Sequence, residues 1–249
     1  MNPVDTEFQD IIARNSRNMR EAQRGDQQYR GDWQEIREPM QYLTVQNGAG
    51  FRYGRISFVN VAVDYTKYFA AGQALRYKQV SGIYKYAYIT KVTTTYIEIF
   101  GGSTYVLANE VVTSVAKGIV PAPTGFPVIF SFDPQIAGLG GTYSNPNPTL
   151  NELFVFSMTG PLVTVKGIMQ NGTVATGSAT LTFISPTEIS STLLNTFEIG
   201  YSTNLGTSYA GLTKTSSTTL VEIYRDVSFA PFAVGVTGSG FNFTITYIL

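Results

Sequence analysis

The chain of 249 residues contains no cysteine and no histidine. Without thiols it can form no disulfide, no thiolate metal site and no cysteine nucleophile. Without imidazole it lacks the side chain that most often exchanges protons near neutral pH and most often binds transition metals. These absences exclude most familiar hydrolytic and metal-dependent chemistries. We therefore expect a protein that is not an enzyme and that uses no cofactor and no metal.

Charged residues and long apolar runs are also scarce. Charged side chains make up 14% of the chain and hydrophobic ones 43%, and the formal net charge is zero. No stretch approaches the roughly 20 apolar residues of a membrane span, and the N-terminus lacks the apolar core of a signal peptide. The sequence predicts neither membrane insertion nor export by the general secretory route.

Glycine and aromatic residues are abundant, and the charges are spread unevenly. The chain has 24 glycines, 16 tyrosines and 16 phenylalanines, which suits a folded, β-rich protein. Residues 1–40 carry 6 basic and 8 acidic side chains, residues 41–120 carry 8 and 3, and residues 121–249 carry 3 and 6. Such steps in composition favour separate structural units.

Residues 1–45 predict an α-helical attachment arm. Between residue 5 and about residue 23 the apolar side chains fall near one helical stripe, and Asp5 is placed to cap the first turn. The stripe is thin, so such a helix needs a partner to be stable. The candidate contacts with another protein or with other copies of the chain are Phe8, Ile11, Met19 and Trp33.

The tripeptide Arg-Gly-Asp occurs twice near the end of this arm, at residues 24–26 and 30–32. One interpretation is an adhesion signal presented on a turn that glycine permits. The other is a helix end followed by a short charged segment. We favour the second, because tripeptide matches arise often by chance.

Residues 46–118 predict a small β-barrel-like domain. From residue 42 the apolar period changes to two, which is typical of strands. Turns are expected at Ser81-Gly82 and at Gly101-Gly102. The candidate strands lie at residues 55–65, 75–80, 83–92, 95–100 and 106–115.

The hairpin at residues 74–91 mixes tyrosines with basic residues. Alternation puts Tyr84, Tyr86 and Tyr88 on one face and Lys85 on the other. A surface for single-stranded nucleic acid needs rings and cations on the same face. We therefore expect the wall of a barrel here and no nucleic-acid binding, with a nucleic-acid-binding β-barrel as an alternative.

Residues 119–127 contain three prolines and predict a stiff, Pro-rich linker that spaces the next unit. Beyond it, strands and turns alternate to the end of the chain. Residues 128–249 therefore predict an antiparallel β-sandwich, like a jelly roll. The candidate strands lie at residues 128–132, 152–158, 162–169, 179–184, 196–201, 219–225, 228–234 and 241–248, and turns are expected between them, among others at Asn171-Gly172 and at residues 235–240.

Two catalytic patterns can be found in the sequence, and both are weak. Ser114 and Lys117 have the spacing of a serine–lysine nucleophile pair, but the partner motifs of such enzymes do not follow. Glycoside hydrolases need only two carboxylates, and six carboxylates occur after residue 120. No feature of the sequence pairs two of them, so a glycan hydrolase is only an alternative.

Four short elements follow one another in the middle of the chain. They are Gly-x-x-x-Arg-x-Lys-Gln at residues 72–79, Tyr-Lys-Tyr at 84–86, Gly-Gly-x-x-Tyr-x-Leu-Ala-Asn at 101–109 and Gly-Phe-Pro at 125–127. In this order and spacing, residues 64–127 resemble a module of minor structural and fibre-type proteins of tailed bacteriophages. The resemblance implies a virion component, often homotrimeric, whose β-sandwich faces outward. The short arm and the absence of repeats fit a tail-tip or short appendage protein better than a long fibre.

The expected function is therefore that of a virion structural protein. Its arm would join it to other virion proteins, and its C-terminal sandwich would bind a glycan or protein on the host surface. Low charge suits sugars, which aromatic rings, amides and hydroxyls can bind. Tyr143, Tyr201 and Tyr209 lie in or beside turn-rich segments and are the candidate ligand contacts. The alternative within this class is a purely architectural head or tail decoration protein that binds no receptor.

Overall fold

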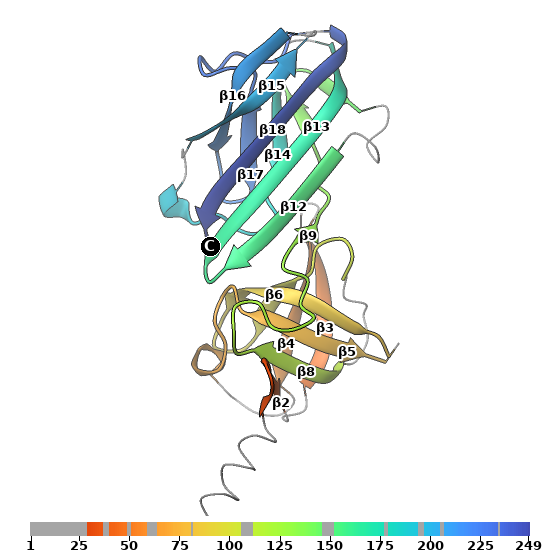
Figure 1. Ribbon diagram of the computed structural model, residues 1–249, viewed down its shortest axis with the longest axis vertical. Coiled ribbons are helices and arrows are strands. Elements are labelled where there is room, and N and C mark those ends of the chain that lie inside the picture. Colours follow the sequence, from red (N-terminus) through yellow and green to blue (C-terminus); the bar gives the residue numbers. More distant parts are fainter. Residues whose placement is uncertain are drawn as a thin grey trace, which may run out of the picture.

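The protein is mainly β, as the sequence predicted, and its strands form two curled antiparallel sheets. Figure 1 shows the sheets stacked along the long axis, with the sheet that comes first in the chain below the second. The computed structural model describes residues 29–36, 40–48, 51–58, 64–80, 82–105, 112–145, 152–176, 179–193, 197–204, 207–233 and 235–249. In these ranges the helices are two short 3-10 turns, Tyr65–Lys67 and Ser191–Leu193.

The first sheet has eight strands in the order β1-β2-β8-β5-β6-β7-β4-β3. They are β1 (Tyr29–Arg30), β2 (Trp33–Ile36), β3 (Met40–Gly48), β4 (Phe51–Phe58), β5 (Ala74–Gln79), β6 (Tyr84–Val92), β7 (Ile97–Phe100) and β8 (Val112–Gly118). The sheet curls far enough to bring β3 close to β8. Its inner face holds a core that includes Leu75, Tyr77, Ile89 and Ile99.

The chain is extended where the structure describes the end of the predicted helical arm. From Tyr29 onward it forms β1, β2 and the start of β3, so the helix prediction is wrong for these residues. Strand β2 pairs with β8, with Trp33 opposite Gly118. Pairing with a distant strand overrides the local preference of this charged segment. Phe8, Ile11 and Met19 lie outside the described residues.

The predicted hairpin between β5 and β6 is confirmed. Gly82 has a φ of +85°, and its amide donates to the Gln79 carbonyl at 2.9 Å, which closes the turn. Ile89 points into the core of the first sheet, whereas Tyr86 and Tyr88 lie on the opposite face and pack in the cluster that joins the two sheets. The two faces of β6 are therefore divided as the alternation predicted.

The second sheet has ten strands, nine of them in the order β10-β14-β17-β16-β15-β18-β13-β12-β9. They are β9 (Phe130–Ser131), β10 (Ala137–Leu139), β11 (Thr142–Ser144), β12 (Glu152–Thr159), β13 (Leu162–Thr176), β14 (Thr180–Ile184), β15 (Phe197–Asn204), β16 (Thr207–Thr215), β17 (Leu220–Tyr224) and β18 (Gly235–Ile248). Strand β10 pairs with β14 and β11 pairs with β13, so these two short strands link opposite limbs of the curled sheet. Across the core, Phe183 of β14 stacks on Phe243 of β18 at 5.2 Å.

Most strands predicted after residue 127 match observed ones, but one strand was missed and three predictions were wrong. Strand β16 was missed, because its few apolar residues give little pattern and its stability comes from pairing with β15 and β17 on both sides. Residues 228–233 form one isolated bridge at Phe232 and no strand. The Asn171-Gly172 turn lies inside β13, and residues 235–240 lie inside β18.

One aromatic cluster joins the two sheets. Phe126 comes from the connecting segment and Phe130 from β9, and their rings lie 5.0 and 5.3 Å from the ring of Tyr88 on β6. Phe156 of β12 packs on the same group, 5.2 Å from Phe100 of β7. The Tyr88 hydroxyl donates to the Val128 carbonyl at 2.8 Å. The two sheets therefore share a core at their junction.

The Pro-rich segment is part of this junction and does not act as a free spacer. The Phe126 amide donates to the Pro123 carbonyl at 2.9 Å, which turns the chain back. This turn places the Phe126 side chain in the core, where it is 7% exposed. The aromatic residue beside the prolines therefore decides where the segment lies.

Backbone contacts between two pairs of residues complete the junction. A Cβ atom on Gly72 would lie 1.6 Å from the carbonyl oxygen of Gly160, in the turn between β12 and β13. A Cβ atom on Gly102 would lie 2.1 Å from the carbonyl oxygen of Ser131 on β9. Only glycine allows the backbones to approach this closely.

Candidate functional site

A pocket of about 300 Å³ opens on the outer side of the second sheet, where β13, β18 and β15 lie side by side. No charged side chain is among the residues that line it. These residues are Ile168, Met169, Gln170, Asn171, Tyr201, Gly240, Phe241 and Asn242. Its volume is at the lower end of the range for small-molecule sites.

Three side chains form a row across the pocket. Asn242 of β18 is paired with Tyr201 of β15 on one side and with Ile168 of β13 on the other. Directly opposed residues in an antiparallel sheet have Cβ atoms about 5 Å apart, so these side chains can contact one ligand together. Tyr201 is 53% exposed, and its hydroxyl lies 2.7 Å from the Ser208 hydroxyl, which orients the ring.

A β-bulge in β13 lies at the rim of the pocket, where the carboxamides of Gln170 and Asn171 join that of Asn242. The register of β13 against β18 shifts between Met169 and Gly172, and Asn171 has a φ of +57°. A bulge of this kind redirects side chains from the regular alternation. Gly172 is required here because a Cβ atom would lie 2.5 Å from the Tyr143 ring. Gln170 and Asn171 are both exposed as a result.

Tyr143 lies away from the pocket, on the core side of β13. It is partly buried against the core, and its hydroxyl contacts Met169 Sδ and lies 3.4 Å from Glu152 Oε1. Burial, followed by the Glu152 carboxylate, raises the pKa of this hydroxyl above its ordinary value. The structure gives Tyr143 a packing role in place of the predicted ligand contact.

Tyr209 is adjacent to Tyr201 in the sheet but lies on the opposite face. In the β15–β16 pairing, Tyr201 is opposite Ala210 while Tyr209 is opposite Ser202, which is fully buried. The guanidinium of Arg225 lies 4.9 Å from the centre of the Tyr209 ring. Of the three predicted tyrosines, the pocket therefore contains Tyr201 alone.

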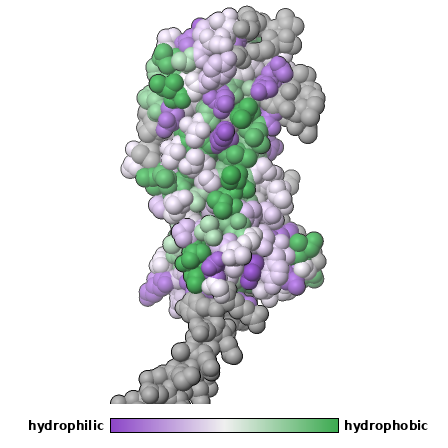
Figure 2. Space-filling view, in the orientation of Figure 1, coloured by the Kyte–Doolittle hydropathy of each residue, from purple (hydrophilic) through white to green (hydrophobic). Residues whose placement is uncertain are grey.

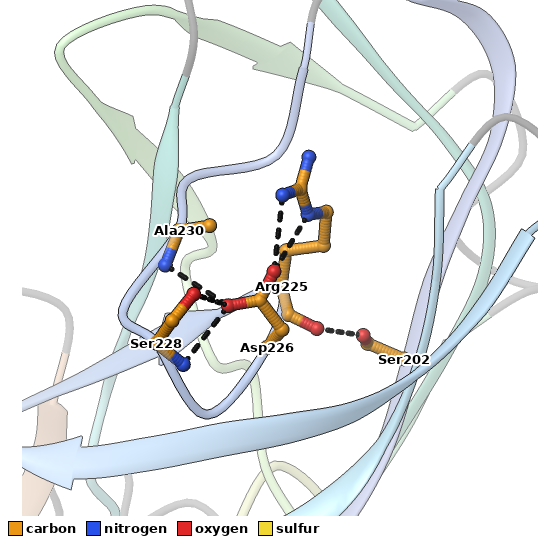
Figure 3. A network of polar contacts seen from close by, with 5 residues as sticks. All are labelled: Ser202, Arg225, Asp226, Ser228 and Ala230. Atoms are coloured by element: carbon orange, nitrogen blue, oxygen red, sulfur yellow. Dashed lines mark hydrogen bonds and ion pairs between the residues drawn. The ribbon is translucent and has the colours of Figure 1, made fainter.

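A polar network surrounds Arg225 (Figure 3). The Asp226 carboxylate accepts hydrogen bonds from the Ser228 hydroxyl and amide and from the Ala230 amide, and it pairs with Arg225 at 3.0 Å. The Ser202 hydroxyl donates to the Arg225 carbonyl. These bonds, above all the one from the Ser228 hydroxyl, lower the pKa of Asp226 to about 2. The network therefore stabilises the loop that follows β17.

Asp226→Asn is expected to lower stability in a pH-dependent way. The carboxylate has a lower pKa in the folded chain than in the unfolded one, so its stabilisation is complete above about pH 5 and is lost between about pH 4 and pH 2. We expect a loss of about 1 kcal/mol at pH 7, since the side chain is partly solvated. Urea unfolding of both proteins at pH 7, 4 and 2.5 measures it. If the difference in unfolding free energy between the two proteins does not shrink on acidification, the stabilisation does not come from the ionised Asp226 carboxylate.

A second cluster combines rings and cations on the outer face of the first sheet. Arg76 lies 4.9 Å from the centre of the Trp33 ring and 5.0 Å from that of Tyr84, and Lys78 lies 5.5 Å from Tyr84. Arg76 and Lys78 are paired with Tyr86 and Tyr84, so they share the tyrosine face. The sequence predicted that the cations and the tyrosine rings lie on different faces of the hairpin. This is wrong for Arg76 and Lys78, because they belong to β5 and the prediction considered only the alternation within β6.

The cations of this cluster already contact its rings within the chain. The cations occupy the faces of the rings, and such contacts contribute about 0.5–1 kcal/mol each at exposed sites. A nucleic-acid base would have to displace Arg76 to stack there.

Trp33, a predicted contact of the N-terminal arm, is 4% exposed, and its indole donates to the Thr124 carbonyl at 2.9 Å. Trp33 is thus a core residue of this chain.

The second Arg-Gly-Asp tripeptide forms the turn between β1 and β2. Gly31 has a φ of +63°, and the Asp32 carboxylate accepts hydrogen bonds from the Thr124 hydroxyl at 2.6 Å and the Thr124 amide at 2.9 Å. These bonds, the hydroxyl bond first, lower the pKa of Asp32. The acid is engaged inside the chain, but the tripeptide lies in a turn between two strands and not at the predicted helix end. The first tripeptide lies outside the described residues.

Ser114 and Lys117 do not form a nucleophile pair. Both lie on β8, and side chains three positions apart on a strand point to opposite faces. The Lys117 ammonium instead donates to the Tyr68 carbonyl and lies 5.6 Å from the Phe69 ring. Burial lowers the pKa of Lys117.

The described part of the chain offers neither a metal site nor a membrane-spanning helix. Among the described residues, no three acidic side chains lie close enough together to hold a metal ion. The described helices include none with the length and apolar character needed to span a bilayer. Comparisons of the chain with protein-family models, curated proteins and solved structures gave no match.

Proposed function

We propose that the chain is a structural protein of a bacteriophage virion, a short tail-fibre or tail-tip appendage, and that it binds a host surface glycan in the pocket of Tyr201 and Asn242. The virion assignment is supported by the resemblance of residues 64–127 to fibre-type proteins. In this proposal the protein is a homotrimer, and residues before Tyr29 join it to other virion proteins. The first sheet acts as a small β-barrel and the second as a β-sandwich of jelly-roll type.

The observation that carries glycan binding is the combination of side chains in the pocket. One exposed aromatic ring, Tyr201, lies beside three carboxamides, those of Gln170, Asn171 and Asn242. A carboxamide both donates and accepts hydrogen bonds, as a sugar hydroxyl does, and an aromatic ring can cover the apolar face of a pyranose. The lining has no charge, which suits a neutral sugar.

The position of the pocket also suits a receptor-binding part. Figure 1 shows β13 and β18 running from the junction to the far end of the second sheet. The pocket residues on β13 lie around its middle, away from Leu162 and the Gly160 turn at the junction. Because the two sheets share a core, the first sheet and the second can present the pocket as one rigid rod.

Tyr201→Ala should abolish glycan binding, and Tyr209→Ala should not. The control removes a tyrosine from the neighbouring strand, but from the opposite face. The full-length proteins are compared on an array of bacterial surface glycans, and retained glycans are measured by calorimetry. We expect at least about a tenfold loss of affinity for Tyr201→Ala, the effect of one well-packed aromatic contact.

Three outcomes would contradict the proposal. Equal binding by the wild type and Tyr201→Ala would remove the pocket from the function. No binding to any glycan, with the protein located on intact particles by immunogold electron microscopy, would favour the architectural decoration protein. Absence of the protein from particles would overturn the virion assignment itself.

A further inference from the structure

The outer face of β15 carries an apolar row that continues from the pocket. Tyr201, Ile199 and Phe197 alternate along the strand on this face and are 53%, 71% and 47% exposed. Phe229 adds a fourth exposed apolar side chain, with its ring 5.6 Å from that of Phe197. A solvated face of an antiparallel sheet is normally polar, so this row calls for a ligand. Figure 2 shows apolar patches on this side of the second sheet, interrupted by polar side chains.

A polar row follows the apolar one on the neighbouring strand. Asn242, Thr244 and Thr246 of β18 are all exposed and share one face by alternation. Asn242 is paired with Tyr201, so the two rows begin together at the pocket. A linear ligand lying along them would meet apolar groups on one side and hydroxyl or amide groups on the other. A chain of pyranose rings has this amphipathic form.

The apolar row is too small to hold a second protein stably. An aromatic side chain has about 150–250 Å² of surface, so the four exposed side chains present roughly 400 Å² together, against ~800 Å² per partner in a stable interface. The row is also longer than one sugar. Alternate residues on a strand are about 6.8 Å apart, so Tyr201 and Phe197 are separated by about 13 Å.

The pocket indicates which sugar the chain would contain. An acetamido group has one N–H donor, one carbonyl acceptor and one methyl group. The carboxamides of Asn171 and Asn242 match the polar atoms, and the Ile168 side chain, paired across from Asn242, can contact the methyl group. Lys166 is exposed farther along β13 but does not line the pocket. The lining itself offers no cation for an acidic sugar.

From these observations we infer that the pocket is one end of a track along β15 and β18, and that the track binds a linear, uncharged chain of N-acetylated sugars. This inference rests on the proposed function, since it extends the same pocket. Tyr201 contacts the sugar in the pocket, and Ile199 and Phe197 contact the sugars that follow it.

The test measures affinity against chain length. The probes are N-acetylglucosamine, hexa-N-acetylchitohexaose (called chitohexaose below) and cellohexaose. Cellohexaose has the same linkage and length as chitohexaose but no acetamido groups. For the wild-type full-length protein we expect chitohexaose to bind at least about tenfold more tightly than the single sugar, because each buried apolar contact adds affinity. Cellohexaose should bind at least about tenfold more weakly than chitohexaose. Calorimetry and saturation-transfer NMR cover both the tight and the weak range.

Ile199→Ser tests the track independently of the pocket. It should weaken chitohexaose about fivefold to tenfold and leave the single sugar unchanged, since Ile199 does not line the pocket. The matched control is Ile83→Ser, which alters an isoleucine of the first sheet that is 68% exposed. Thermal unfolding of each variant confirms that it is folded. A loss with Ile83→Ser equal to that with Ile199→Ser would overturn the track.

The remaining outcomes separate the inference from the proposed function. Chitohexaose binding no more tightly than the single sugar, or Ile199→Ser binding as the wild type does, would overturn the track but leave the pocket. Preferred binding of cellohexaose or of a charged hyaluronan hexasaccharide would overturn the inferred sugar. Absence of binding by any probe and by the glycan array together would reject the proposed function as well.

Discussion

Gly72→Ala is expected to lower the free energy of unfolding by at least about 3 kcal/mol. Gly72 has a φ of +80°, which costs another residue about 1–2 kcal/mol. Its new Cβ atom would also lie 1.6 Å from the Gly160 carbonyl oxygen, so one backbone must move away from the other. Overpacking of this kind adds about 1–3 kcal/mol. Urea unfolding followed by tyrosine fluorescence and by circular dichroism measures the loss.

The effect should come from the junction, and Gly82→Ala tests this. Gly82 has almost the same φ, +85°, but a Cβ atom there would meet no atom within 4 Å. This control should therefore lose only the conformational part, about 1–2 kcal/mol. Gly72→Ala should also separate the transitions seen by the two probes, because the sheets would no longer unfold together. Equal losses in the two variants would show that the close approach of Gly72 and Gly160 contributes nothing.

Local periodicity was sufficient to predict the β class and many of the strands. On β6, for example, it correctly placed Tyr86 and Tyr88 on the face opposite Ala87 and Ile89, because a strand has a fixed period of two. It could not predict what covers that tyrosine face. The cover comes from Phe126 and Phe156, which are distant in sequence, and no local pattern encodes such a pairing.

The same limit explains the errors near the N-terminus. The segment containing Trp33 was grouped with a helical arm because it is charged and short. In the structure it is a strand held by β8, with its ring under Arg76 and its indole bonded to Thr124. Each partner lies more than 40 positions away, so only the tertiary fold brings them together.

The candidate site could be predicted only in part. Tyr201 was identified because it lies beside a turn-rich segment, but the carboxamides of Asn171 and Asn242 were not identified as ligand contacts. The Asn171-Gly172 pair was interpreted as a hairpin turn, although a β-bulge uses the same residues for the same reason, their tolerance of positive φ. The length of β13 distinguishes the two, and it becomes visible only in the pairing with β18.

Phe156→Ala should be the most damaging single change in the shared core, at about 3–5 kcal/mol. Phe156 is 1% exposed, and its ring lies 5.2 Å from Phe100 and 5.7 Å from Phe130. It therefore packs between β7 of the first sheet and β9 of the second. Removing it leaves a cavity at the point where the two sheets meet, and relaxation of one sheet cannot fill it. Urea unfolding of the full-length protein measures the loss.

Phe197→Ala is the matched control, since it removes the same ring from the second sheet where the ring is 47% exposed. It should lose about 1 kcal/mol or less, because the transfer of this ring from water is incomplete in the native state. If the junction makes the two sheets one cooperative unit, Phe156→Ala should also turn a single unfolding transition into two. A single transition with a small loss would mean that the aromatic cluster between the sheets contributes little and that each sheet is stable on its own core.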